Sequence, residues 1–419
     1  MARLRLTWIS LLAGALVLSS CGEAGRAPNV GAHASGASFE ALAKQPFTVA
    51  KTYQSRQWAK IERLSHSYDR FPVEKARPNG RHTDPEIVRA FGTEFPASRE
   101  VLLHYGSGWE KNEGTPVLLV HGSILEATSA WIEPHGQEGL AKSLDAAGFR
   151  VFAVTFAHRH GDNYLWAEQI ANAISRIKAV TGAKAVDVVG HSKGTVAARA
   201  YASGLRQSWM SRYQGDIRKL VLIGGPHLGL DYPFRHPVIN WGLYPEKKQT
   251  IMNAPLSWTK MLVLGVWVDT GHLSIFKEDG DYFPGQAQML YRWDQEYPLP
   301  KLEQDWYTTY HGGQGFVSVS PGIDKAIADG GHFIDKLRKK PLDQGIALAV
   351  LAGDQATMKN VLNEKTGPSD GVCFVKSATH TADMTAGGAK LLAKDVLPLN
   401  HMELIYAPAA KRWVERVLK

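Results

Sequence analysis

A serine between two glycines is the first group in this sequence that could do chemistry. Residues 190–194 are Gly-His-Ser-Lys-Gly, which follow the apolar run 185–189 and precede an alanine-rich stretch. The run before the motif predicts a strand and the stretch after it predicts a helix. A serine held at a sharp strand-to-helix turn has a strained backbone, and glycines beside it remove Cβ atoms that would clash. The pattern therefore predicts that Ser192 presents its hydroxyl as a nucleophile.

A serine hydroxyl needs a neighbouring base, and the base needs a carboxylate that orients it. Both are expected after Ser192 if the chain follows the order serine, acid, histidine. Two aspartates follow the apolar segment 346–351. We favour Asp370, which lies in a Pro-Ser-Asp-Gly turn leading into a second apolar run. Asp354 is the alternative acid, although a turn residue at the end of a strand is its plainer interpretation.

The base is expected on a loop near the carboxyl end of the chain. His401, one of 16 histidines, lies within Leu-Asn-His-Met at 399–402 and has this position. His380 and His332 are the competitors. His380 follows Asp370 by only ten residues (380 − 370 = 10), which makes it the less natural base. We therefore predict His401 as the base.

Catalysis by a serine also needs donors for the oxyanion of the tetrahedral intermediate. One donor is expected from the backbone N–H of Lys193, directly after the nucleophile. The other is expected from Ser123, in the His-Gly-Ser segment that follows the apolar run 116–120. His121 is expected to hold this segment in place and not to act as a base.

Strands that alternate with helices are expected to position these residues. This alternation predicts a parallel sheet covered by helices on both faces. The predicted strands are 101–104, 116–120, 149–156, 184–189, 219–224 and 346–351, and the predicted helices are 137–147, 163–180 and 193–205.

A long insertion interrupts the alternation between about 230 and 342. It is rich in Trp, Tyr, Pro and Gly, and its length exceeds that of an ordinary connection, which indicates a functional cap or a subdomain. Its continuously apolar run 261–268 has two open interpretations, a buried core element or a lid that faces substrate.

The amino-terminal residues predict export. Residues 1–20 carry two arginines and an apolar run too short to span a bilayer, which is typical of a signal peptide. Leu-Ser-Ser-Cys at 18–21 resembles the bacterial lipoprotein box, so we expect Cys21 to be lipidated, and the alternative is an ordinary secreted protein. Residues 21–38 are predicted to be a flexible tether, 39–99 an extension with a possible helix at 57–66, and 100–419 the main domain.

Composition excludes several classes of protein. The 419 residues are 44% hydrophobic, which suits a large globular core. The formal net charge is +8, but basic residues are scattered, so no nucleic-acid partner is expected. Only two cysteines are present, Cys21 and Cys373, which exclude a disulfide framework, and Cys373 is expected to be a buried lone thiol.

Five motifs in this order resemble those of the secreted bacterial lipases and esterases of the α/β-hydrolase superfamily. They are Val-His-Gly at 120–122, Gly-His-Ser-Lys-Gly at 190–194, Gly-Pro-His-Leu-Gly at 225–229, Ser-Asp-Gly-Val at 369–372 and Leu-Asn-His at 399–401. The resemblance covers the chain from about Val101 to its end. It departs from the usual pattern at Gly225, where a threonine is more common, and at Lys193.

The resemblance implies an α/β-hydrolase fold, a mostly parallel twisted sheet flanked by helices with a lid insertion. It implies that Ser192, Asp370 and His401 form a catalytic triad. The implied activity is carboxylic ester hydrolysis, foremost that of a lipase acting on acyl esters. A polyester (polyhydroxyalkanoate-type) depolymerase and an acyltransferase remain alternatives, and a non-catalytic binding protein is a remote one.

No cofactor is expected for this chemistry. Some lipases of this kind carry a structural calcium ion, and Asp383 and Glu403 are acids near the predicted acid and base. The sequence does not define a ligand set for calcium. Membrane association is expected only through a lipidated Cys21.

Overall fold

A computed structural model describes residues 47–77, 79–243, 254–299, 304–358, 361–362 and 364–419. The predicted signal peptide, the tether and Cys21 lie outside the described residues. Among the described helices, none is both long enough and apolar enough to cross a bilayer.

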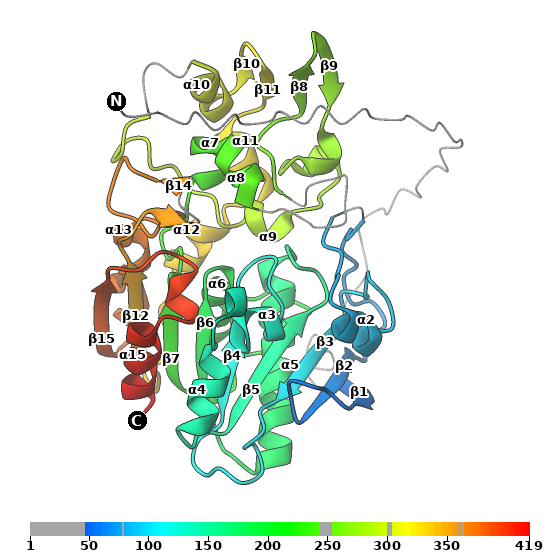
Figure 1. Ribbon diagram of the computed structural model, residues 1–419, viewed down its shortest axis with the longest axis vertical. Helices are drawn as coiled ribbons and strands as arrows, with labels where there is room; N and C mark the ends of the chain where they lie inside the picture. Colours follow the sequence, from blue (N-terminus) through cyan, green and yellow to red (C-terminus); the bar gives the residue numbers. More distant parts are fainter. Residues whose placement is uncertain (1–46, 78, 244–253, 300–303, 359–360, 363) are drawn as a thin grey trace, which may run out of the picture. The chain divides into compact units, whose positions relative to one another are not determined.

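The described residues form a nine-stranded sheet in the order β1-β2-β3-β5-β4-β6-β7-β12-β15 (Figure 1). The six strands from β5 to β15 run parallel, whereas β1, β2 and β3 are joined by antiparallel pairing to one another and to β5. The strands are β1 (Phe47–Tyr53), β2 (Lys60–His66), β3 (Glu100–Tyr105), β4 (Val117–Val120), β5 (Val151–Phe156), β6 (Val186–His191), β7 (Ile217–Ile223), β12 (Ala347–Gly353) and β15 (Lys390–Leu397).

Helices cover both faces of this sheet, because successive strand residues point to opposite faces and both sets are apolar. One face carries α5 (Asn163–Thr181), α6 (Lys193–Ala202) and α12 (Phe333–Arg338). The other face carries α2 (Pro85–Phe91), α3 (Ala127–Trp131), α4 (Leu140–Ala146) and α15 (Pro408–Leu418). The sheet predicted from alternating strands and helices, covered on both faces, is confirmed.

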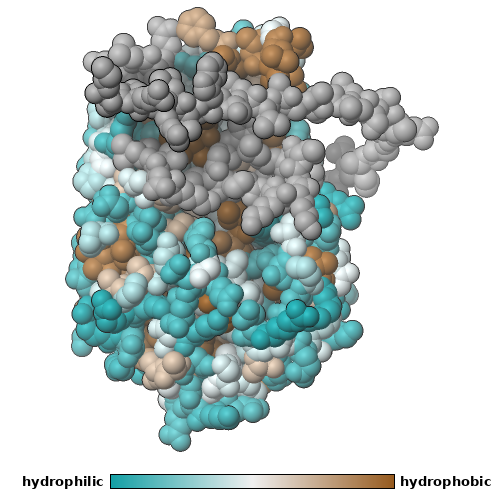
Figure 2. All heavy atoms as spheres, viewed as in Figure 1, coloured by the Kyte–Doolittle hydropathy of each residue, from teal (hydrophilic) through white to brown (hydrophobic). Residues whose placement is uncertain are grey.

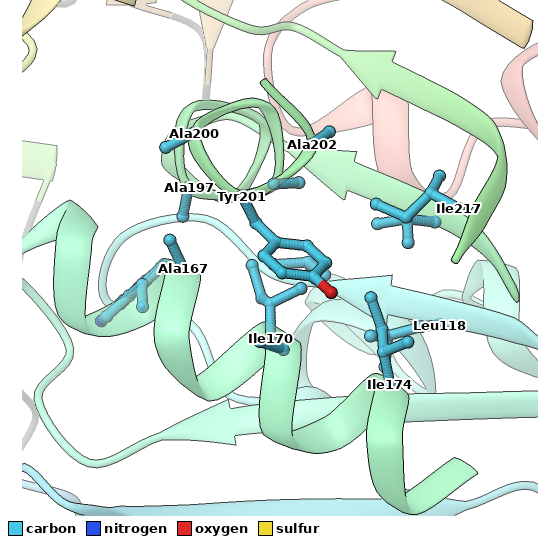
Figure 3. Close-up of a cluster of buried hydrophobic side chains, with 14 of the residues drawn as sticks. Leu118, Ala167, Ile170, Ile174, Ala197, Ala200, Tyr201, Ala202 and Ile217 are labelled. Atoms are coloured by element: carbon cyan, nitrogen blue, oxygen red, sulfur yellow. The ribbon is translucent and has the colours of Figure 1, made fainter. Parts of the chain in front are cut away.

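Small residues bring α6, the helix that follows Ser192, close to α5. Figure 3 shows Ala197 and Tyr201 of α6 facing Ala167 and Ile170 of α5. The Tyr201 hydroxyl donates a hydrogen bond of 2.8 Å to Asp216 Oδ1, so its polar end is satisfied inside the core. This packing fixes α6, and with it the residues at its amino end.

The possible helix at 57–66 is wrong, because β2 occupies most of this range. Ile61 and Leu64 are three residues apart, which suits one face of a helix, but in a strand that spacing places them on opposite faces. Ile61 packs into the core on the α3 and α4 side of the sheet and Leu64 into the core on the α5 and α6 side. Because both faces are covered, both residues are buried, and the segment extends the main sheet.

The insertion between β7 and β12 lies beyond the carboxyl ends of the parallel strands and has its own apolar core (Figure 1). Its helices are α7 (Tyr232–Arg235), α8 (Pro237–Leu243), α9 (Pro284–Ala287), α10 (Gln304–His311) and α11 (Ile323–Asp329), and its strands are β8 (Lys260–Val263), β9 (Val266–Asp269), β10 (Gly313–Gln314) and β11 (Ser318–Ser320). The insertion also contains the 3-10 turns Gly271–Leu273 and Lys277–Asp279. Short elements elsewhere are β13 (Thr357–Met358), β14 (Val361–Leu362), α13 (Val375–Ala378), α14 (Ala382–Thr385), and the 3-10 turns Pro134–Gly136 and Glu403–Ile405.

The apolar run 261–268 is not a buried core element, so that interpretation of it is wrong, whereas the lid interpretation stays a prediction. It forms the hairpin of β8 and β9, with Leu264 and Gly265 at positive φ (49° and 84°) in the turn. Leu264 is 89% exposed and Val266 64% exposed. Figure 2 shows apolar side chains gathered at this end of the insertion. A two-residue turn leaves the side chains at its tip without neighbours, so apolarity alone does not bury them.

Candidate active site

Ser192 occupies a strained turn between β6 and α6. Its backbone has φ 52° and ψ −127°, a conformation that costs a non-glycine residue about 1–3 kcal/mol. The side chain is half-buried. A methyl group at Gly194 would lie 2.4 Å from the carbonyl oxygen of His121 and 2.5 Å from that of Val120, so glycine is required there. The predicted strand-turn-helix geometry is therefore present.

Asp370 and His401 form a buried pair. His401 Nδ1 lies 2.7 Å from Asp370 Oδ2, and the His401 backbone N–H donates to the Asp370 carbonyl oxygen at 2.8 Å. Asp370 Oδ1 accepts hydrogen bonds from the backbone N–H groups of Val372 (3.0 Å) and Cys373 (2.7 Å). These bonds leave the carboxylate one orientation, with Oδ2 toward the imidazole. Cys373 is buried, as predicted.

His191 contacts His401 from the other side. Its Nε2 lies 3.0 Å from the His401 carbonyl oxygen, and the two rings are 4.7 Å apart. Burial, reinforced by the neighbouring His401, holds the pKa of His191 well below its usual range, so the ring is neutral and donates through Nε2–H. The sequence placed His191 inside the motif but gave no reason to expect this contact.

A cavity of about 680 Å³ opens at the carboxyl ends of β4 and β6. Ser192, His401 and Ser123 line it together, whereas Asp370 lies behind His401. Most of the other lining side chains are apolar: Ile124, Leu125, Leu230, Met289, Met358, Val372, Met402 and Tyr406. The structure thus brings the three predicted residues to one site.

The two predicted oxyanion donors flank Ser192. Within the described part of the chain, the backbone N–H groups of Ser123 and Lys193 donate no hydrogen bond to the protein. Lys193 is the first residue of α6, where backbone N–H groups have no partner within the helix. A methyl group at Gly122 would lie 2.9 Å from Ser192 Cβ, so glycine allows the Ser123 segment to approach Ser192.

His121 contacts its own segment, in the position where it was expected to hold the loop. Its Nδ1 lies 2.6 Å from the Gly122 carbonyl oxygen, and its ring packs against Phe156 and Trp166. Burial lowers the pKa of His121 to about 3, so it carries no charge near neutral pH.

The Lys193 side chain points away from the cavity into the protein. Its Nζ lies 3.1 Å from the centre of the Trp166 ring, a close cation–π geometry, and the residue is fully buried. Burial holds the pKa of Lys193 well below its usual range, although Glu74 and Asp162 oppose this effect. Glu74 comes from the segment 39–99, to which the sequence assigned no role. The Lys193 side chain thus packs in the interior against Trp166 and does not line the cavity.

Gly225, the other departure from the lipase pattern, has a local explanation. A methyl group there would lie 2.4 Å from Thr195 Oγ1 and 2.4 Å from the His227 ring. The hydroxyl of Thr195 therefore occupies the space beside residue 225, where a larger side chain would not fit.

The competing residues lie apart from Ser192. Asp354 is exposed and lines no part of the cavity. His380 pairs instead with Asp383, at 3.0 Å between Nε2 and Oδ2. His332 is exposed at the start of α12. None of the three contacts Ser192 or His401 in the described part of the chain.

The two acids considered for calcium contact other groups of the protein. Asp383 pairs with Arg338 at 3.0 Å, whereas Glu403 accepts a hydrogen bond of 2.9 Å from the Asn400 backbone. Among the described residues, no three His, Cys, Asp or Glu side chains group to hold a metal ion.

Fold and site together define a hydrolase-type α/β protein with a serine at the turn after a central strand. A model of the alpha/beta hydrolase family matches residues 117–380, more than half of the chain. The chain therefore belongs to the alpha/beta hydrolase family. No curated protein sequence matches it.

Three solved structures illustrate the likeness. The mature form of the Bacillus licheniformis lipase BlEst2 is 13% identical, with 76% of this chain and 98% of that chain covered and a TM-score of 0.44. Naproxen esterase (carboxylesterase NP) from Bacillus subtilis is 14% identical, with 76% and 88% covered and a TM-score of 0.38. A thioesterase domain from the curacin biosynthetic pathway is 18% identical, with 76% and 95% covered and a TM-score of 0.34.

Proposed function

We propose that this protein is a carboxylic ester hydrolase, foremost a lipase, that works through an acyl-enzyme on Ser192. The observation that carries the proposal is the arrangement at one cavity. It combines a strained serine, a histidine paired with a buried aspartate, and two backbone N–H groups beside the serine that donate to no other described residue. These groups are the parts that acyl transfer to a serine requires.

In the first half of the reaction, Ser192 Oγ attacks the ester carbonyl carbon and its proton passes to His401 Nε2. Asp370 accepts the Nδ1–H of the resulting imidazolium and stabilises its charge. The N–H groups of Ser123 and Lys193 donate to the oxyanion, and each such donor is worth about 3–4 kcal/mol of transition-state stabilisation. The alkoxide then leaves as the alcohol, carrying the proton from His401.

In the second half, a water molecule replaces the alcohol. His401 takes a proton from this water as the oxygen attacks the acyl carbon on Ser192. Collapse of the second intermediate returns the proton to Ser192 Oγ and releases the carboxylic acid. An alcohol or amine that enters in place of water would give acyl transfer by the same steps.

The apolar lining supports an aliphatic acyl group as the bound part of the substrate. Three methionines, Met289, Met358 and Met402, are flexible side chains that adapt to chains of different shape. The cavity volume of about 680 Å³ falls in the range of ordinary small-molecule sites, about 300–1,000 Å³.

The test is hydrolysis of p-nitrophenyl esters by the wild-type protein and by Ser192→Ala. Ser203→Ala is the matched control, because this serine lies at the other end of α6 and, among the described residues, its hydroxyl donates only to the Ala200 carbonyl oxygen. We expect Ser192→Ala to lose hydrolysis and labelling by a fluorophosphonate probe, with an unchanged circular dichroism spectrum. Hydrolysis retained by Ser192→Ala would overturn the proposal. Triglycerides, polyester films and added acceptor alcohols then separate lipase, depolymerase and acyltransferase.

A further inference from the structure

One short turn of the insertion touches both residues that carry the oxyanion donors. Gly285 of α9 lies against the Lys193 side chain: a methyl group on Gly285 would be 2.3 Å from Lys193 Cε and 1.9 Å from the Gly161 carbonyl oxygen. The next residue, Gln286, is buried, lines the cavity and contacts Ser123. The insertion therefore contributes directly to the surroundings of the catalytic serine.

The Gln286 amide uses both of its hydrogens. Nε2 donates to Ser123 Oγ at 2.8 Å and faces His160 Nδ1 at 3.3 Å. A hydrogen bond on the hydroxyl fixes the Ser123 side-chain rotamer, and this restrains the backbone that carries the Ser123 N–H.

The backbone after Ser123 needs such a restraint. Ile124 has φ 58°, a conformation that is a clear outlier for a β-branched residue. Such strain persists only where surrounding contacts hold it. Arg159 supplies one contact, donating from Nε to the Ile124 carbonyl oxygen at 2.7 Å. Gln286 supplies another on the Ser123 side.

The turn that carries Gln286 is itself held by buried hydrogen bonds. The Gly285 N–H donates to the His160 carbonyl oxygen at 3.1 Å, and Asn163 Nδ2 donates to the Gly285 carbonyl oxygen at 3.1 Å. Gln288 Oε1 accepts from the Asn163 backbone N–H at 2.7 Å, and its Nε2 donates to Asp162 Oδ2 at 2.6 Å. These bonds attach this part of the insertion to the loop after β5.

We propose that Gln286 is a positioning residue for the oxyanion site, acting through the Ser123 hydroxyl. The inference rests on the proposed function. Gln286 does not take part in bond breaking; it holds the Ser123 N–H at the place where the oxyanion forms. Its loss leaves both N–H donors present but one of them poorly placed.

The experiment is a double-mutant cycle of Gln286→Met and Ser123→Ala on a short, soluble p-nitrophenyl ester. Each variant removes one side of the same hydrogen bond, and Ser123→Ala keeps the backbone N–H. We expect each to lower kcat about tenfold, less than the 10²–10³-fold loss of a whole donor, with KM nearly unchanged. The kcat of the double variant should be no lower than that of either single variant, because each single substitution already removes the hydrogen bond between Gln286 and Ser123.

Gln169→Met is the matched control. Gln169 is also buried, and its Nε2 also contacts two acceptors, the carbonyl oxygens of Ser98 and Glu100, away from the cavity. If the role of Gln286 is purely structural, both methionine variants should lower Tm, and their kcat values should be equal. We expect a similar Tm for both and a lower kcat for Gln286→Met only. If Gln286→Met does not fold, Ser123→Ala alone must show the tenfold loss.

The inference would be overturned if the loss of kcat in the double variant equalled the product of the two single losses. So would a Gln286→Met variant whose kcat equals that of Gln169→Met. Both results leave the proposed function standing, provided that hydrolysis by the wild type depends on Ser192. A wild type without Ser192-dependent hydrolysis overturns the proposed function and the inference together.

Discussion

Gly122→Ala tests whether the Ser123 segment must approach the nucleophile. Gly122 has an ordinary backbone conformation, so alanine introduces no backbone strain there. The new methyl group would lie 2.9 Å from Ser192 Cβ and 3.2 Å from His191 Nδ1. The perturbation is therefore steric and confined to the active site.

The displacement it causes follows from these distances. Carbon atoms in contact are about 3.5–4.0 Å apart, so the segment must move by about 0.6–1.1 Å. A misplacement of about 1 Å costs on the order of 10²-fold in rate. We expect kcat to fall about 10²-fold, equivalent to about 2.7 kcal/mol of transition-state stabilisation. Overpacking costs about 1–3 kcal/mol of folding stability, which a protein with this core should survive.

The assay is kcat and KM for a soluble p-nitrophenyl ester, with Tm measured in parallel. Gly345→Ala is the control, because Gly345 is exposed and the nearest atom to its new methyl group belongs to the exposed Asp343 side chain, at 3.1 Å. KM should change little, because the apolar cavity is intact. A Gly122→Ala protein with the kcat of the control would refute the assignment of the Ser123 N–H as an oxyanion donor.

Two further predictions concern acidic residues, the buried Asp370 and the half-buried Glu74. Asp370→Asn should lower kcat about 10⁴-fold, as measured by steady-state kinetics. The new amide would donate to His401 Nδ1 and force the tautomer that cannot accept the Ser192 proton. A loss of less than tenfold would contradict this prediction. Glu74→Gln should flatten the dependence of stability on pH, because burial raises the pKa of Glu74 from 4.5 to about 8. The folded protein then keeps a proton that the unfolded chain releases, so wild-type stability should fall as pH rises across this window. Urea unfolding at several pH values compares the two proteins, and parallel curves would contradict the prediction.

The parts of the fold and site that depend on local pattern were predictable from the sequence. Apolar runs marked the central strands, and a serine between glycines marked the turn at Ser192. The order of elements along the chain predicts the acid and the base on loops after later strands, and Asp370 and His401 lie on such loops. Their chemical roles stay a prediction until they are measured.

The parts that depend on contacts distant in sequence were not predictable. Gln286 meets Ser123 across 163 residues, inside an insertion without regular periodicity. Glu74 lies near Lys193 only because the fold brings the amino-terminal segment beside α6. The strand at Lys60–His66 was missed because a strand buried on both faces lacks the alternation that identifies strands.

Under the proposed function, the strained backbone of Ser192 lowers the stability of the fold at the residue that carries out the reaction. Glycine at this position would adopt φ 52° without strain, which would raise folding stability by about 1–3 kcal/mol. The greater chain entropy of glycine in the unfolded state would lower folding stability by about 0.5–1 kcal/mol. The variant without a nucleophile should then be the more stable protein. A directed-evolution screen for heat resistance that does not also select for turnover would enrich inactive sequences at this residue first.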